Sequence, residues 1–172
     1  MTSASVAYQN ASTLKPRPAL AILVGGLIVG VLDLLYAIVV YSPRKPILVP
    51  QTIASGVLGV KAYAGGAPTA ALGVVLHFVI ALGAATVYYL ASQKLTFLVR
   101  RAVLFGLIYG ALVYVFMHWV VVPLSAAPQG HAPTIYKVFE FVEHWFWVGL
   151  PISLSVRHYS RSGTINDEVS TT

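Results

Sequence analysis

The chain has 172 residues, a net charge of +6 and no cysteine. Hydrophobic residues make up 58% of it and charged residues only 9%, which excludes an ordinary soluble domain and predicts a membrane protein. The missing cysteines exclude disulfides, thiolate metal ligands, iron–sulfur clusters and haem attached through cysteine.

Four apolar stretches each approach the roughly 20 residues with which a helix crosses a bilayer. They are residues 19–41, 69–91, 102–123 and 136–156. The fourth contains charged residues, so a surface orientation is an alternative, but large apolar side chains around its whole circumference favour spanning. The sequence predicts an all-α integral membrane four-helix bundle. Its four-span domain (19–157) lies between an N-terminal tail (1–18) and a C-terminal tail (158–172).

The connection between the first two stretches is long, apolar and bounded by prolines. Residues 50–63 are predicted to form a short helix, because Pro50 suits a first helical turn. Small residues in this segment permit close packing. We expect an interfacial or re-entrant helix in the first outer loop.

Basic residues lie at the ends of the apolar stretches and form no patch with interleaved aromatic residues, so no nucleic-acid partner is predicted. One side carries Lys15, Arg17, Lys94, Arg100, Arg101, Arg157 and Arg161. The other side carries Arg44, Lys45, Lys61 and Lys137. The positive-inside rule then places both termini in the cytoplasm and the first and third loops outside.

Each predicted span carries at least one ionisable side chain. These are Asp33, His77, His118, Glu140, Glu143 and His144. At 1.5 Å per residue, all lie within about 6 to 12 Å of the predicted outer boundary, which predicts one buried polar layer. Because charges inside a bilayer are costly, we expect pairs such as Asp33 with His77 or His118, and Glu143 with His118.

Small residues repeat at four-residue spacing on two of the spans, which lets helices approach closely. They are Gly26 and Gly30 in the first span and Gly106 and Gly110 in the third. On the fourth span, helical spacing predicts that Glu140 and His144 share one face with Trp147 or Pro151, with Glu143 adjacent to it. The ionisable groups are therefore expected on the faces that pack against neighbouring helices.

Three interpretations of the polar layer remain open. The favoured one is a structural network in a membrane scaffold or accessory protein, whose partners are the lipid bilayer, a second copy or other membrane subunits. The second is a site for a proton or divalent metal ion in a small transporter or sensor. Its candidate metal ligands are His77, His118, Glu143 and His144. The third is haem b held between two histidines, such as His77 or His118 with His144.

Sequence patterns typical of enzymes are missing from the chain. It has no Walker or dinucleotide-binding glycine pattern, no Gly-x-Ser-x-Gly and no His-Glu-x-x-His. Ser92, Ser153 and Ser155 lie toward the predicted cytoplasmic ends, away from the histidines, so a Ser–His nucleophile is not expected. The function is therefore predicted to be non-enzymatic, with no catalytic residue and no cofactor required.

Four stretches carry a resemblance to known proteins. They are GGLIVGVLDLLYA (25–37), QTIASGVLGVKAYAGG (51–66), LGVVLHFVIALGAATVYYLA (72–91) and VVVPLSAAP (120–128). In these motifs the chain resembles a set of small, uncharacterised four-span bacterial inner-membrane proteins. It is more distantly similar to the YagU-like inner-membrane proteins in the order of spans and the histidine-bearing last helix. The resemblance covers roughly residues 19–157 and implies a bacterial cytoplasmic-membrane location and a four-helix fold, with no reaction attached.

Overall fold

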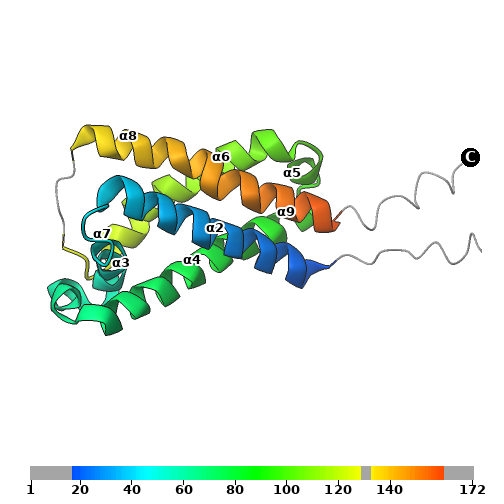
Figure 1. Ribbon diagram of the computed structural model, residues 1–172. Helices are drawn as coiled ribbons and strands as arrows, with labels where there is room; N and C mark the ends of the chain where they lie inside the picture. The colour runs from blue at the N-terminus through cyan, green and yellow to red at the C-terminus, as the bar shows by residue number, and fades with distance from the viewer. Residues whose placement is uncertain (1–16, 129–132, 161–172) are drawn as a thin grey trace, which may run out of the picture.

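The computed structural model describes residues 17–128 and 133–160, and every regular element within them is helical (Figure 1). The predicted tails fall almost wholly outside these residues. In chain order the elements are α2 (Pro18–Tyr41), α3 (Leu48–Leu58), the 3₁₀ helix η1 (Gly59–Ala64), α4 (Gly66–Lys94), α5 (Phe97–Arg100), α6 (Ala102–Phe116), the π-helical segment η2 (Met117–Val121), α7 (Val122–Leu124), α8 (Thr134–Glu143), the π-helical segment η3 (His144–Gly149) and α9 (Leu150–Ser160). The all-α prediction is confirmed for this part of the chain.

Three helices among the described residues are long and apolar enough to cross a membrane. They are Pro18–Tyr41, Gly66–Lys94 and Ala102–Leu124, the last of which joins α6, η2 and α7. The first three predicted spans lie within them. The fourth predicted span, 136–156, falls in the continuous helical run of α8, η3 and α9, which is not one of the three. The chain is therefore a helical membrane protein with three candidate spanning helices.

Close contact between α2 and α4 depends on two glycines of α2. A Cβ atom on Gly26 would lie 2.7 Å from Cδ2 of Leu82, and one on Gly30 would overlap the ring of Phe78. These are the glycines whose four-residue spacing predicted a helix contact. The contact brings the middle of α4 against α2, next to Asp33.

Contact between α6 and the run of α8, η3 and α9 depends on glycines from both sides. A Cβ on Gly106 would overlap the Ser153 hydroxyl, and one on Gly110 would overlap the backbone carbonyl of His144. A Cβ on Gly149 would overlap the carbonyl of Gly106. The two backbones therefore touch, and this contact fixes the position of His144.

The first-loop helix packs against the beginning of α4. A Cβ on Gly73 would overlap the Pro50 carbonyl oxygen, and the buried Gln51 donates from Nε2 to the Gly66 carbonyl oxygen at 3.1 Å. The predicted helix over 50–63 differs from the structure, because α3 ends at Leu58 and a 3₁₀ helix follows. Gly59, with φ +62°, ends the α-helix there.

The helices are arranged around α2, which packs against both α4 and α9, while α6 packs against η3 and α9. Helices α4 and α6 are not in broad contact. They meet at Tyr109, whose hydroxyl donates to the Ala84 carbonyl oxygen at 2.7 Å and whose ring lies 4.9 Å from that of Tyr88. Beyond this contact, toward α3 and α7, the two helices leave room for a cavity.

Candidate functional site

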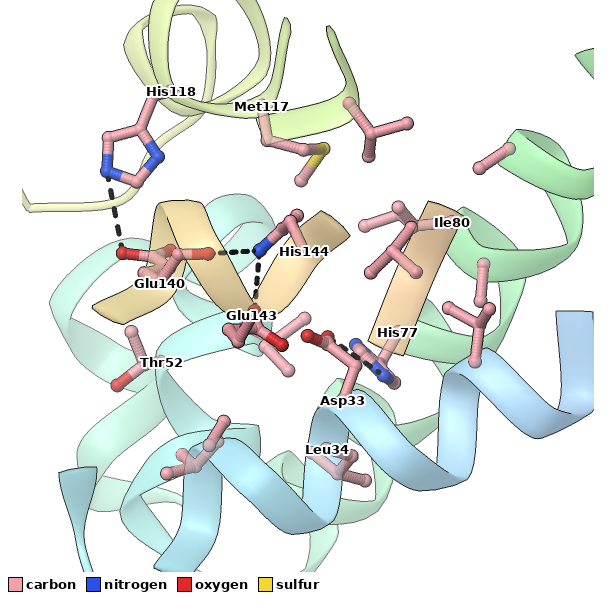
Figure 2. Close-up of a pocket in the computed structure, with 18 of the residues that line it drawn as sticks. Asp33, Leu34, Thr52, His77, Ile80, Met117, His118, Glu140, Glu143 and His144 are labelled. Atoms are coloured by element: carbon pink, nitrogen blue, oxygen red, sulfur yellow. Dashed lines mark hydrogen bonds and ion pairs between the residues drawn. The ribbon is translucent and has the colours of Figure 1, made fainter. Parts of the chain in front are cut away.

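A cavity of about 540 Å³ lies among α2, α4, α6, η2, α8 and η3, with α3 contributing to one side. We call it the polar cavity, because its lining includes all six ionisable residues of the predicted layer, several of them labelled in Figure 2. These are Asp33, His77, His118, Glu140, Glu143 and His144. The structure thus brings the six groups around one space.

The polar cavity lies in the half of the protein that holds α3, α7 and the start of α8 (Figure 1). The described ends of the chain meet at the opposite end, where the Arg17 amide donates to the Tyr159 carbonyl oxygen at 3.4 Å. The ionisable groups therefore lie away from the N- and C-terminal ends of the helical domain, and their depth of about 6 to 12 Å below the outer membrane boundary stays a prediction.

His77 of α4 connects two parts of α2. Its Nε2 lies 3.1 Å from the Gly30 carbonyl oxygen and 3.6 Å from Oδ2 of Asp33. A carbonyl oxygen only accepts hydrogen bonds, so Nε2 carries a proton and donates it. Of the two partners expected for Asp33, His77 and His118, the structure shows His77, and this contact holds the Asp33 carboxylate at the wall of the cavity.

Glu143 and His144 are adjacent in sequence and both are buried. His144 Nδ1 lies 2.7 Å from the Glu140 carbonyl oxygen and 2.5 Å from Oε1 of Glu143. The carbonyl requires a proton on Nδ1, so the neutral ring keeps a lone pair on Nε2. The imidazole is thereby oriented by the backbone of its own helix.

The second carboxylate oxygen of Glu143, Oε2, is buried and has no hydrogen-bond partner among the described residues. The Glu143 side chain is only 4% exposed. A buried, unpartnered carboxylate oxygen is costly, because it has lost its hydration without gaining a donor. In Figure 2 the Glu143 and Asp33 side chains approach each other, and the two carboxyl groups are within hydrogen-bonding reach. Two carboxylates this close repel each other, so either a proton shared between them or a cation is needed there.

His118 of η2 lies at the rim of the cavity. Its Nε2 is 3.7 Å from Oε2 of Glu140, and the two side chains are 29% and 35% exposed. Its ring stacks on Tyr114 at 4.4 Å. The expected pairing of His118 with Glu143 is wrong, because Glu143 points inward to His144 while Glu140, nearly one turn earlier, faces η2.

The buried face of the last helical run differs from the prediction. Trp147 is 39% exposed, whereas Val148 and Gly149 are buried with Glu143 and His144. The reason is the π-helical segment, whose i→i+5 repeat places Val148 rather than Trp147 in line with Glu143. Glu140 and His144 both reach the cavity, but Trp147 does not share their face.

Asp33, Glu143 and His144 form a compact group. One potential ligand atom from each lies within 4.8 Å of the other two. Two carboxylates and an imidazole are a ligand set suited to divalent zinc, manganese or iron. Of the predicted metal ligands, Glu143 and His144 belong to this group, whereas His77 adjoins it through Asp33 and His118 lies at the rim.

The three comparisons with known proteins gave no relative. No family model, no curated protein and no solved structure matches the chain. The functional argument therefore depends on the geometry of the polar cavity.

Sequence reasoning placed Asp33 in the polar layer but not among the metal ligands. Its position could have been anticipated, because it follows Gly30 by three residues and so lies near the face that contacts α4. The sequence predicted an interfacial or re-entrant helix in the first loop, but not that α3 lines the cavity. Val49, Thr52 and Ile53 line the cavity, and no local sequence pattern predicts that contact.

The serines considered as nucleophiles are hydrogen-bonded to backbone carbonyl groups. Ser92, Ser153 and Ser155 donate to the carbonyl oxygens of Tyr89, Leu150 and Ala21 at 2.6, 3.0 and 2.9 Å. None of the three lines the polar cavity. Among the described residues that line the cavity, the histidines therefore have no serine hydroxyl to activate.

Proposed function

We propose that the protein binds a divalent transition-metal ion in the polar cavity, through Asp33, Glu143 and His144, as a small transporter or sensor. The observation that carries the proposal is the unpartnered Oε2 of the buried Glu143 beside a second carboxylate and an imidazole. A cation placed among these atoms would stabilise both carboxylates at once. His144 adds an imidazole nitrogen within 4.8 Å of an oxygen of each carboxylate.

The chemistry of the ligands favours zinc or manganese. Without cysteine the chain offers no thiolate, and Asp33, Glu143 and His144 supply only nitrogen and oxygen ligands. Catalytic zinc sites hold three such side chains with an open position. The Glu140 carbonyl oxygen lies 2.7 Å from His144 Nδ1 and so orients the imidazole ring. His77 stands beside Asp33 and would orient that carboxylate from outside the ligand set.

The topology that best supports this function has four spans, with the run of α8, η3 and α9 as the fourth and α3 as an interfacial or re-entrant helix. The contact of Arg17 with Tyr159 supports it, because adjacent ends require an even number of crossings. Charge distribution supports cytoplasmic termini, and the motif resemblance supports a bacterial inner membrane. Single cysteines placed at Lys45 and Lys94 would be labelled from opposite sides of the membrane.

A scaffold or accessory role is the second candidate. It is favoured by the ion pairs themselves, since each of His77, His118 and His144 already has a carboxylate neighbour within 3.7 Å. A self-satisfied network of this kind needs no ion. Haem b has less support, because the structure directs each histidine to a carboxylate rather than to another histidine.

Zinc binding by the purified protein in nanodiscs tests the proposed function. We expect one equivalent of Zn²⁺ to bind saturably and to raise the thermal midpoint, since at 100 times Kd a ligand adds about 2.7 kcal/mol of stability. Mg²⁺ should have little effect, because it prefers oxygen ligands in an octahedron. No stoichiometric zinc and an unchanged midpoint would instead support the scaffold.

A further inference from the structure

We infer that the polar cavity also takes an amphipathic organic cation, an ammonium group on a short apolar body, in competition with the metal ion. The inference rests on the proposed function in so far as both ligands would use Asp33 and Glu143. Three separate observations support it: the size of the cavity, the nature of its walls and the sign of its charged groups.

The cavity is much larger than a metal ion requires. Its volume of about 540 Å³ compares with roughly 30 Å³ for one water molecule in the liquid. Pockets for small organic molecules have volumes of about 300 to 1,000 Å³. A metal ion with its remaining water ligands would occupy only the part of the cavity next to Glu143.

The rest of the wall is apolar and comes from helices on several sides. Its apolar side chains include Val29, Leu34, Ile80, Val113, Met117 and Val148. Water gains few hydrogen bonds against such a surface, whereas an alkyl or aromatic group is stabilised there by burial. The cavity therefore has a polar part at Asp33, Glu143 and His144 and an apolar part suited to a hydrocarbon body.

The charged groups of the cavity favour a cation. Its lining has three carboxylates, on Asp33, Glu140 and Glu143, and of the described residues that line it none is a lysine or arginine. An ammonium group would donate charge-assisted hydrogen bonds to these carboxylates, whereas a carboxylate or phosphate would be repelled.

Two tyrosines add to this preference. The rings of Tyr41 and Tyr136 both line the cavity, and their centroids lie 5.7 Å apart in an edge-to-face arrangement. Aromatic rings attract cations through their negative faces. The cavity thus combines carboxylates and aromatic rings without any fixed positive group.

Calorimetry with three eight-carbon ligands tests the inference on the whole protein in nanodiscs, with heats from empty nanodiscs subtracted. Octylammonium, octanoate and octanol share the apolar chain and differ in charge. We expect saturable binding of one octylammonium, and only membrane partitioning for octanoate and octanol. Zinc should lower the apparent affinity for octylammonium by about tenfold when present at about ten times its own Kd, because the two compete.

A cavity-filling variant separates the organic ligand from the metal. Ala84→Phe places a ring in the apolar wall, away from the carboxylates, and should lower octylammonium affinity about tenfold or more, because each methylene kept out of the wall loses about 0.8 kcal/mol of burial. Its zinc affinity should stay within about twofold. Val113→Phe, on the facing helix, serves if the first variant does not fold. Val79→Phe is the control, because Val79 lies on α4 like Ala84 but is 60% exposed, and it should change neither affinity.

The outcomes distinguish the two proposals. Zinc binding without saturable octylammonium binding overturns the organic-cation inference and leaves the metal site intact. Octylammonium binding that weakens in Ala84→Phe, in a protein that takes up no zinc, overturns the metal site and supports the inference. Octylammonium binding that is unchanged in both Ala84→Phe and Val113→Phe overturns the inference, since the ligand then lies elsewhere.

Discussion

Glu143→Gln is expected to lower the affinity for zinc about 100-fold or more, because losing even an outer hydrogen-bond partner of a metal ligand costs 10- to 100-fold. The substitution removes a charged ligand but keeps the shape of the side chain. Its amide oxygen can still accept from His144 Nδ1, and its amide nitrogen supplies a donor where Oε2 had no partner. The thermal midpoint without metal should therefore be unchanged or higher, as measured by unfolding in nanodiscs.

Glu140→Gln is the matched control for that variant. Glu140 lines the same cavity and carries the same charge, but its side chain is 35% exposed and lies at the rim beside His118. Its zinc affinity should fall by less than about tenfold. Equal losses in both variants would show that zinc responds to the overall charge of the cavity. A lower midpoint in Glu143→Gln, together with unchanged zinc binding, would contradict the assignment of Glu143 as a ligand.

Gly110→Val is expected to destabilise the protein by about 3 kcal/mol, the upper end of the usual cost of overpacking. A Cβ at this position overlaps the His144 carbonyl, which is backbone and cannot turn away as a side chain can. The contact of α6 with η3 must then open. Because the same contact fixes His144, zinc affinity should fall together with the thermal midpoint, and both are measured in one zinc titration followed by thermal unfolding.

Gly83→Val on α4 controls for the change of residue type. A Cβ at Gly83 has nothing within 4 Å, so the valine meets no neighbour inside the protein. Its effect should be limited to helix propensity, where valine is slightly better than glycine, and should stay within about 1 kcal/mol. If the two valine variants were equally destabilised, the close approach of α6 to η3 would not be the cause.

Much of the helical architecture follows from local patterns that are visible in the sequence. The first three apolar stretches are long enough to form spanning helices, and the glycine pairs of α2 and α6 lie on helix contacts because residues four apart share a face. The rise per residue also placed the six ionisable groups at a similar depth. For Asp33 this limited the expected partner to His77 or His118, and the structure shows His77.

The rest of the site depends on features that have no local signal. The π-helical segment η3 changes which side chains share a face, so a reading at the α-helical repeat put Trp147 in line with His144. The position of α3 depends on a backbone contact between Pro50 and Gly73, residues that belong to different helices. Neither the cavity nor its apolar wall can be deduced without these contacts.

The central claim is that Asp33, Glu143 and His144 hold one divalent metal ion, and X-ray absorption at the zinc edge of the zinc-loaded protein tests it most directly. The expected result is one zinc per chain, bound by nitrogen and oxygen atoms at about 2.0 to 2.2 Å, with the outer-shell scattering of a single imidazole that disappears in His144→Ala. A protein that retains no zinc after dialysis, or a zinc spectrum that is the same in His144→Ala, would contradict the account.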